Sequence, residues 1–297
     1  MANIPLNDRD DGIAQELADR QAIIKQDNTN SLDGILHSNA KGRQSEGGLR
    51  VKGYSKEFYH DQPLITVITV VFNAKEQLEK TIESVIGQDY GNIEYIIIDG
   101  GSTDGTLDII KKYDHVIDYW VSEKDEGIYD AMNKAVSVST GDYINFMNAG
   151  DLFFEINTIK KVAPFLIAEL VYGNHAVYFD DSNKINIVDV GNQIKKKDIP
   201  FCHQSLFEKR ILLQKYPFNL DYKISSDYDH YLTCKHKNVT IQYIPLVISK
   251  FLDGGLSSKQ IKKLLEENYH ASKKYYKFYS KYVYFKRLLK FHLFGKQ

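Results

Sequence analysis

At 297 residues, with 43% hydrophobic and 26% charged side chains, the chain has the composition of an ordinary soluble globular protein. It is long enough for one large domain or for one domain with smaller appendages. Its formal net charge of −1 argues against a general nucleic-acid-binding protein, so no nucleic-acid partner is expected.

The charge is unevenly distributed along the chain. Residues 259–297 hold eleven Lys and Arg against two Glu, a local charge of +9, which leaves −10 for residues 1–258. Cys202 and Cys234 lack metal-ligand spacing and are typical of reduced thiols in the cytosol. No signal-peptide core is apparent, and no stretch approaches the roughly 18 uncharged apolar residues of a membrane-spanning helix. We therefore expect a cytoplasmic protein, free or peripherally bound to a membrane.

Residues 1–60 form a polar extension rich in Asp, Asn, Gly and Ser. A helix is possible through Gly12–Lys25, followed by a loop-like stretch to about Arg50. Such a composition indicates a segment that is either partly disordered or packed on the body of the protein.

From Pro63 onward, strands alternate with helices. Leu64–Phe72 is a continuous β-branched run, as expected of a parallel strand covered on both faces. Further strands are predicted at Ile93–Ile98, Val116–Val121 and Asp142–Met147, and helices at Ala74–Gln88, Thr106–Lys112 and Ile128–Val138. This alternation predicts an α/β fold with a mostly parallel central sheet flanked by helices.

After Asp151 the alternation becomes irregular. Helices are predicted at Thr158–Glu169, His203–Gln214 and Ser225–Lys235, a hairpin-like strand pair at Leu170–Phe179 and Lys184–Val190, a strand at Thr240–Ser249, and a glycine-bearing loop at Phe251–Ser257. The tail from Lys259 reads as one or two basic amphipathic helices.

Two strand ends carry the first candidate site residues. Asp99 to Asp104 follow one strand, and a carboxylate there can accept hydrogen bonds from a base or a ribose, or can simply build a tight turn. Asn148-Ala149-Gly150-Asp151 follow another strand, where Asp151 can hold a divalent cation or cap the next helix. Together they suggest one site for a charged, metal-bound, nucleotide-like ligand.

Polar residues of three further segments could join that site. Asp130 and Asn133 share one face of the helix beginning at Ile128, either for a ligand or for solvent. Asp227 lies in the first turn of a predicted helix, which suits a general base or simple helix stabilisation. His203 and Gln204 could orient a sugar or phosphate, although a lone His is often structural.

Taken together, these segments resemble the family 2 glycosyltransferases, which have a GT-A fold. The resemblance covers roughly residues 63–257. The stretches that carry it are PLITVITVVFN (63–73), IIIDGGSTDGT (96–106), SEKDEGIYDAMNK (122–134), GDYINFMNAGD (141–151), FCHQSLF (201–207) and YKISSDYD (222–229). Among them, GIYDAMNK, HQSLF and SSDYD are most similar to the branch with colanic-acid, exopolysaccharide and O-antigen transferases.

The resemblance implies transfer of a sugar from a nucleotide diphosphate, usually UDP, with inversion at the anomeric carbon. Asp99 would correspond to the carboxylate that reads the uracil, and Asp125 would lie near the nucleotide. Asp104, Asp130, Asn133, His203 and Gln204 are assigned to the donor site on the same basis.

The metal motif of the family is only partly present. Asp151 falls in the D-x-D motif, but Asn148 stands at its first Asp and Gly150 where many members have Asp. Asp151 would then hold Mg²⁺ or Mn²⁺ as a Lewis acid at the departing diphosphate. Asp227 falls at the position of the catalytic base, where it would take the proton of the acceptor hydroxyl.

The tail alternates basic residues with aromatic and aliphatic ones, which suits an anionic membrane surface; packing on the body or in an oligomer is the alternative. A polyprenyl-diphosphate-linked glycan would then be the acceptor, on the inner face of a bacterial plasma membrane. We expect a polar extension (1–60), a catalytic domain (61–258) with donor (61–151) and acceptor (152–258) halves, and a helical tail (259–297).

Two other functions remain open from the sequence. A non-catalytic relative could bind a sugar nucleotide, as the depleted metal motif would allow. A nucleotidyltransferase would need a Gly- or Arg-rich phosphate loop after the first strand, where Asn73–Gln77 (NAKEQ) stands instead.

Overall fold

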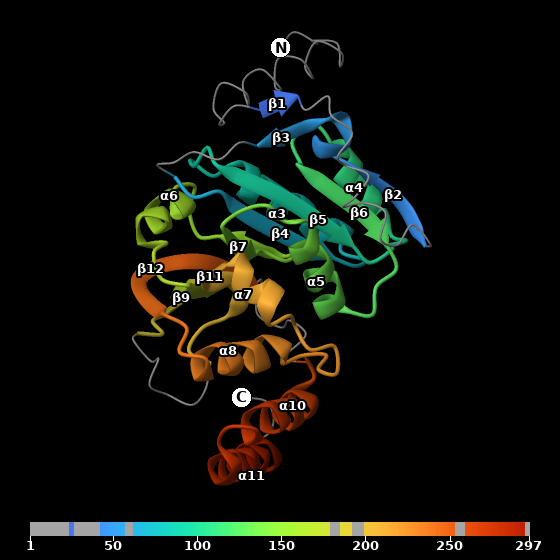
Figure 1. Cartoon of the computed structure of the whole chain (residues 1–297). Helices are drawn as coiled ribbons and strands as arrows, with labels where there is room; N and C mark the ends of the chain where they lie inside the picture. Colours follow the sequence, from blue (N-terminus) through green and yellow to red (C-terminus); the bar gives the residue numbers. More distant parts are fainter. Residues whose placement is uncertain are drawn as a thin grey trace.

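The computed structural model describes residues 24–26, 42–56, 62–178, 185–191, 199–252 and 259–294. Within these ranges, one sheet runs through the molecule in the order β2-β6-β5-β4-β7-β11-β9-β12-β8, with β10 added on β9. Helices cover both of its faces, and two further helices form a layer at the end away from the N-terminus (Figure 1).

Four parallel strands form the centre of the sheet. β4 (Ile65–Val71) lies between β5 (Ile93–Asp99) and β7 (Tyr143–Phe146), and β6 (Tyr119–Glu123) pairs with β5. Every residue of β4 and β5 is buried, which suits the β-branched side chains that make up all of β4 and most of β5. The predicted parallel sheet is confirmed, although β6 begins later than the expected Val116.

Helices from the first half cover both faces of these strands. α3 (Lys75–Ile86), α4 (Thr106–Lys112) and α6 (Thr158–Val162) pack on one face. α5 (Ile128–Val138) and α7 (Arg210–Lys215) pack on the other. Leu78 and Ile82 of α3 and Ala135 of α5 are fully buried, and Met132 of α5 is 1% exposed. The predicted helical periodicity therefore identifies the packing faces correctly.

The second half extends the sheet with mixed pairing. β11 (Leu206–Lys209) is antiparallel to β7 and β9 (Leu170–Tyr178), and β12 (Ile241–Leu252) is parallel to β9 and antiparallel to β8 (Asp151–Phe153). β10 (Ile185–Val188) pairs antiparallel with β9, which confirms the predicted hairpin-like pair. α8 (Ser226–His236) covers this half.

Two predicted helices of the second half are wrong in part. Instead of one helix, His203–Gln214 forms the 3-10 turn η4 (His203–Ser205), the strand β11 and then most of the helix α7. The helix is interrupted because residues 206–209 pair as a strand between β7 and β9. The helix predicted to Glu169 leaves α-helical geometry after Val162 and continues as a 3-10 turn, η3 (Ala163–Phe165), where Pro164 lacks the N–H that a longer helix needs.

The described part of the N-terminal extension packs on the body. β2 (Arg43–Gly47) is an edge strand antiparallel to β6, and η2 (Arg50–Lys52) follows it. The Arg50 guanidinium forms an ion pair with the buried Glu94. A short pair, β1 (Ile24–Gln26) with β3 (Tyr54–Lys56), lies beside it. The expected loop to about Arg50 is therefore wrong for residues 43–47, which form β2. The helix predicted over Gly12–Lys25 lies outside the described residues except for Ile24 and Lys25, which belong to β1.

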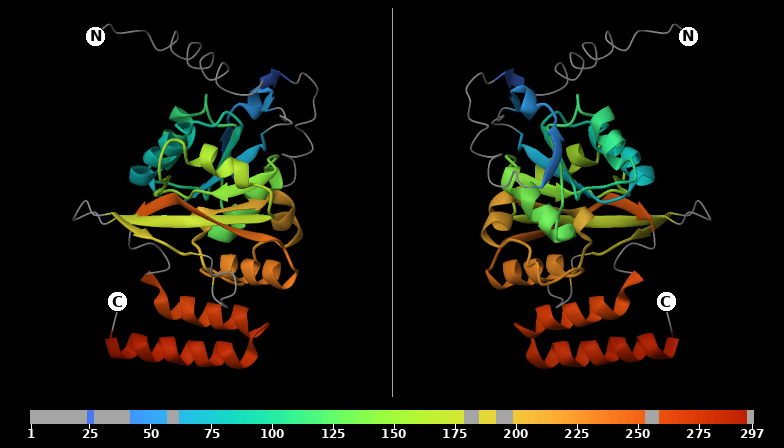
Figure 2. Two further views of the ribbon diagram at one scale, coloured as in Figure 1. Left: turned by 90° about the vertical axis from the view of Figure 1, so that its left-hand side faces the viewer. Right: turned by 90° about the vertical axis from the view of Figure 1, so that its right-hand side faces the viewer.

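The C-terminal tail is a helical hairpin. α10 (Ile261–Lys273) packs on α8, and α11 (Lys277–Phe294) packs on α10. Figure 2 shows both helices as a separate layer beyond α8. Across the described ranges, no helix combines the length and the apolarity needed to cross a bilayer. Of the predicted loop Phe251–Ser257, Phe251 and Leu252 end β12 and the rest lies outside the described residues.

Candidate active site

The carboxyl ends of the parallel strands bring together the residues that the sequence singled out. Asp99 ends β5, Asp125 follows β6 by two residues, and Asn148 follows β7 by two. Because these strands run in the same direction, their ends meet at one edge of the sheet, where open α/β sheets bind ligands.

Asp99 is fully buried and anchors the loop that follows β5. Its carboxylate accepts hydrogen bonds from the Ser102 hydroxyl at 2.5 Å, from the Ser102 amide at 3.1 Å and from the Ser122 hydroxyl at 2.6 Å. The turn-building interpretation is therefore confirmed. Because Asp99 holds the loop after β5 in place, it also determines where that loop can contact a ligand.

Asp104 joins two helix N-termini. Its carboxylate accepts from the Thr106 hydroxyl at 2.5 Å, the Thr106 amide at 3.0 Å and the Lys75 amide at 3.1 Å. The Thr106 hydroxyl contributes most to lowering the pKa of Asp104, and the backbone amides add to it. Asp104 thus ties the first turns of α3 and α4 together.

Asp125 faces the backbone of Gly100. A Cβ at Gly100 would lie 2.5 Å from Asp125 Oδ2, so only glycine allows this approach. The Gly127 amide donates to Asp125 Oδ1 at 2.9 Å. Burial raises the pKa of Asp125, with the nearby Asp130 and Asp99 acting in the same direction. A carboxylate with this surrounding is well placed to accept a hydrogen bond from a ligand.

Asp130 and Asn133 share a helix face but have different partners. The Glu126 amide donates to Asp130 Oδ2 at 3.0 Å, and Lys134 forms ion pairs with Asp130 and with Glu123 at 3.2 and 3.1 Å. The Asn133 amide is engaged at both ends by the backbone of Phe218, at 2.9 and 3.0 Å. Asn133 therefore holds the segment leading to α8, a role that the sequence did not suggest.

The second group of predicted residues meets around His203. Its Nε2 lies 2.9 Å from Asn148 Nδ2, and its Nδ1 lies 3.7 Å from Asp227 Oδ2. The Tyr129 hydroxyl donates to Asp227 Oδ1 at 3.1 Å. Residues from α5 and η4 thus contact the Asp227 carboxylate, and Asn148, which follows β7, contacts His203. The Asp227 side chain is 25% exposed and accessible to a ligand.

Asp151 lies beside this group on the strand side. Its carboxylate accepts a hydrogen bond from Gln204 Nε2 at 2.8 Å. Burial raises the pKa of Asp151 to about 6, although His203 and Gln204 act in the opposite direction. Asp151 is partly exposed, and its carboxylate keeps acceptor capacity beyond the hydrogen bond from Gln204.

The donor atoms around Asp151 fit a hard divalent cation. Among the described residues, Asn148 Oδ1 and Gln204 Oε1 are buried without a hydrogen-bond partner, and Gln204 contacts the Asp151 carboxylate through its Nε2. Oxygen ligands are those that Mg²⁺ and Mn²⁺ prefer. No group of three or more His, Cys, Asp or Glu could hold a metal in the described ranges. A cation here would therefore depend on amide oxygens and on the ligand's own phosphates.

The backbone explains one departure from the family motif. Gly150 has φ of 98°, a conformation that L side chains rarely adopt, and the turn it makes leads directly into Asp151. An Asp at this position would be strained, so the glycine follows from the turn geometry.

Tyr129 and Asn148 were not predicted from the sequence to be residues of this site. The Tyr129 ring packs in the core, 5.4 Å from that of Phe218. Its hydroxyl at the end of an otherwise apolar face was the available signal. Asn148 was noted only as a missing Asp.

A family model described as glycosyl transferase family 2 matches residues 66–230. A PGL/p-HBAD biosynthesis glycosyltransferase of Mycobacterium bovis is 30% identical over 213 residues, which cover 68% of this chain and 82% of the relative. A protein with the same description from Mycobacterium tuberculosis matches to the same extent.

Solved structures share the fold. The crystal structure of S. aureus TarS 1-349 in complex with UDP has a TM-score of 0.56 at 16% identity, over 78% of this chain and 75% of that one. The mannosyltransferase PcManGT from Pyrobaculum calidifontis, in complex with GDP-Man and Mn²⁺, has a TM-score of 0.54 at 18% identity, over 71% and 63%. These similarities confirm the GT-A-like fold predicted from the sequence.

Proposed function

The chain belongs to glycosyl transferase family 2 and is a nucleotide-sugar-dependent glycosyltransferase, and from this we propose that it is an inverting enzyme that uses a UDP-sugar. The acceptor is a hydroxyl of a lipid-linked bacterial surface glycan of the exopolysaccharide or O-antigen type. Membership of this enzyme family removes the non-catalytic and nucleotidyltransferase alternatives. The observation that carries the proposal is the accessible Asp227 carboxylate, which faces His203 while the neighbouring Gln204 binds Asp151.

Inversion is a single in-line displacement, which needs one base on the acceptor side. Asp227 takes the proton of the acceptor hydroxyl as that oxygen attacks C1 of the sugar and the bond from C1 to the diphosphate breaks. Tyr129 donates to one carboxylate oxygen at 3.1 Å and leaves the other facing His203, so the carboxylate has a defined orientation. A base fixed in this way needs little rearrangement to receive the proton.

The opposite side of the site suits the nucleotide diphosphate. Asp99 ends β5 and Asp125 follows β6 by two residues; Asp125 would lie beside the nucleoside, and the fully buried Asp99 would hold the loop that the base contacts. Asp104 and Asp130 maintain the surrounding loops. UDP as the nucleotide is supported by the UDP and UDP-GlcNAc bound in the TarS structures of similar fold.

Asp151, with the free amide oxygens of Asn148 and Gln204, would hold Mg²⁺ or Mn²⁺. When bound, such a cation neutralises the negative charge that develops on the departing diphosphate. PcManGT, whose structure contains Mn²⁺, supports a divalent cation in this fold. His203 and Gln204 orient the residues around that position.

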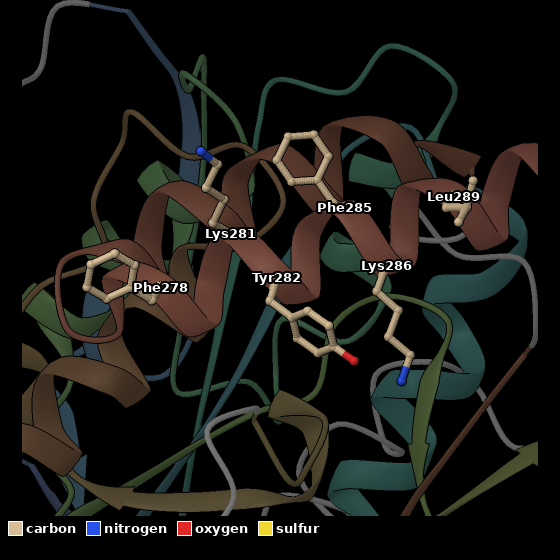
Figure 3. Close-up of a pocket in the computed structure, with 6 residues that line it drawn as sticks. All are labelled: Phe278, Lys281, Tyr282, Phe285, Lys286 and Leu289. Carbon is tan, nitrogen blue, oxygen red and sulfur yellow. The ribbon is translucent and has the colours of Figure 1, made fainter.

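A lipid-linked acceptor places the enzyme at the inner face of an anionic membrane, and α11 supplies a suitable surface. We define the outer face of α11 by its exposed apolar side chains, Phe278, Tyr282, Phe285, Leu289 and Leu293, which are 55–87% exposed. Their spacing of three or four residues puts them on one side of the helix. All of them except Leu293 line a shallow groove of about 600 Å³ together with Lys281 and Lys286 (Figure 3).

Basic side chains flank the outer face of α11 on both sides. Lys281 and Lys286 lie at its edges, Lys277 and Lys290 lie farther round, and the helix contains no Asp or Glu. Apolar side chains that enter the interface between flanking lysines are typical of helices lying on anionic lipid. The same positive charge opposes pairing of this face with a second copy of itself. We therefore assign this face to an anionic membrane surface.

We retain the division of the chain into an N-terminal extension (1–60), a catalytic domain (61–258) and a tail (259–297) as part of this proposal. The donor half (61–151) supplies the strand ends, and the acceptor half (152–258) supplies Asp227. Residues 43–47 of the extension add an edge strand to the catalytic sheet.

The test is turnover by the wild type and by Asp227→Asn. UDP release is measured over a panel of UDP-sugars with a short lipid-diphosphate-linked sugar as acceptor, with and without Mn²⁺. Loss of the base lowers kcat by roughly 10²–10⁴-fold. Asp221→Asn is the matched control, because Asp221 is exposed and lies in the segment before α8. Near-normal kcat in Asp227→Asn with intact UDP binding would remove Asp227 from this role.

A further inference from the structure

We propose that Glu267, on α10 of the C-terminal hairpin, is a positioning residue for Asp227, so that the hairpin is part of the acceptor side of the catalytic site. This rests on the proposed function, in which Asp227 is the base. It gives the tail a role in turnover in addition to any role in membrane contact.

The carboxylate of Glu267 binds three consecutive backbone amides. It accepts from the N–H of Lys223 at 3.0 and 3.1 Å, from that of Ile224 at 2.8 Å and from that of Ser225 at 3.0 Å. Glu267 is only 8% exposed, although it is a charged residue on a terminal helix. Both of its oxygens are thus used by the segment that leads directly into α8.

This arrangement anchors the chain at the point where α8 begins. Ser225 is the N-cap residue of α8 and its side chain makes no capping hydrogen bond, while Glu267 binds the backbone amide of Ser225 and the two amides before it. Three amides converging on one point form a site for an anion, and the positive end of the α8 dipole adds to its attraction. In the described part of the chain Glu267 forms no ion pair, so these amides and the helix end compensate its buried charge.

The position of the anchored segment matters because Asp227 is the second residue of α8. Ser225 lies two residues before it, and its amide is held by Glu267. If the segment moves, Asp227 moves relative to Tyr129 and His203, which come from other elements. A displacement of about 1 Å at a reacting group can cost about 10² in rate.

A second contact ties the hairpin to α8 and reaches Tyr222, with Lys274 Nζ 5.3 Å from its ring centre, but it involves none of the amides of residues 223–225. Lys274 Nζ forms an ion pair with Asp229 Oδ1 at 2.7 Å, and the Tyr275 hydroxyl lies 3.1 Å from that of Thr233. Lys274 is therefore a matched control: its loss weakens docking of the hairpin but leaves the amides of residues 223–225 bound to Glu267.

The test compares Glu267→Ala, Glu267→Gln and Lys274→Ala in the full chain. We expect Glu267→Ala to lower kcat by about 10–10²-fold with the KM for the UDP-sugar unchanged, because only the base is displaced. Glu267→Gln retains one acceptor oxygen and should lie between Glu267→Ala and the wild type. Lys274→Ala should lower the melting temperature while its kcat stays within about twofold of wild type. Equal effects of Glu267→Ala and Lys274→Ala on kcat, or a fall in kcat accompanied by an equal loss of donor binding, would overturn the proposal.

Amide hydrogen exchange gives a readout independent of turnover. Exchange at residues 223–225 should be at least about tenfold faster in Glu267→Ala than in the wild type, and unchanged in Lys274→Ala. Unchanged protection in Glu267→Ala would overturn the positioning role even if the chosen substrates were wrong. A wild type that turns over no donor, with protection lost in Glu267→Ala, would count against the proposed function and leave the anchoring of this segment established.

Discussion

The Tyr129 hydroxyl donates a hydrogen bond to Asp227 Oδ1 at 3.1 Å, across 98 residues of sequence. Tyr129 lies on α5, which packs on the parallel strands, whereas Asp227 lies on α8, which covers the antiparallel half. The hydrogen bond therefore joins the donor and acceptor halves of the candidate site at the residue assigned as the base.

Removing only this hydroxyl should lower kcat while keeping the fold. Tyr129→Phe retains the ring that packs 5.4 Å from Phe218. A hydrogen bond to a charged group is worth about 1.5–3 kcal/mol, and part of that orients the carboxylate, so we expect kcat to fall about tenfold. Steady-state turnover at saturating donor checks this.

Tyr95→Phe is the control for Tyr129→Phe. The Tyr95 hydroxyl is also buried and lies 3.0 Å from the Thr69 hydroxyl, in a different part of the core. Its removal should cost stability but not kcat. If both substitutions reduce kcat alike, the effect is one of core packing and not of Asp227 orientation.

Asp151 should make the stability of the cation-free protein depend on pH. Burial raises its pKa from 3.8 to about 6, so the folded state favours the protonated form. This contribution to stability is complete below pH 3.8 and is lost as the pH rises through about 6. Asp151→Asn, which is always neutral, should therefore exceed the wild type in stability by up to about 3 kcal/mol at neutral pH and much less at pH near 4.

Thermal melts across this pH range test the Asp151 prediction. Asp104→Asn should instead be less stable than the wild type at neutral pH, and the difference should shrink at low pH. The reason is that hydrogen bonds from Thr106 and the backbone lower the pKa of Asp104 and stabilise its ionised form. Adding Mn²⁺ and UDP should raise the melting temperature of the wild type and have a much smaller effect on Asp151→Asn. An equal increase in both proteins would place the cation elsewhere.

Restoring an Asp at position 150 should not improve the metal site. A Cβ there would meet only Gln77, at 3.7 Å, so the obstacle is the φ of 98° and not a clash. Gly150→Ala and Gly150→Asp should both lose about 1–2 kcal/mol of unfolding free energy. Chemical denaturation measures the loss, and tighter Mn²⁺ binding by a fully stable Gly150→Asp would contradict this explanation.

The fold could be predicted where local pattern and tertiary environment agree. The β-branched run at 65–71 and the periodic helix at 128–138 are long and strongly patterned, and the structure confirms them. The polar strand Arg43–Gly47 and the four-residue strand Leu206–Lys209 were not predicted. Both exist because neighbouring strands offer backbone hydrogen bonds, and these partners (β6 for the first, β7 and β9 for the second) are distant in sequence.

Prediction of the candidate site was limited in a similar way. Strand-end position and residue type were enough to select Asp99 and Asp151, and a place in the first turn of a predicted helix was enough to select Asp227. The partners that orient them were not visible, because Tyr129 and Glu267 are brought to Asp227 and its segment only by the packing of helices distant in sequence. Asn133 shows the reverse case: its position on the helix suggested a ligand, but the backbone of Phe218 uses its amide.

The outer face of α11 should bind anionic lipid through both its charge and its apolar side chains. Reversing two flanking charges in Lys281→Glu/Lys286→Glu should weaken binding to phosphatidylglycerol-containing vesicles by at least about tenfold, since each basic residue near such a surface contributes about 1 kcal/mol. Lys80→Glu/Lys111→Glu changes the net charge equally on the exposed surfaces of α3 and α4, and should bind as the wild type does. Vesicle co-sedimentation at two salt concentrations measures this, with binding weaker at the higher salt. Equal losses of vesicle binding in the two double variants would contradict this prediction, because the variants differ in whether the reversed charges lie on α11. Equal binding of the wild type to neutral phosphatidylcholine vesicles would contradict it as well.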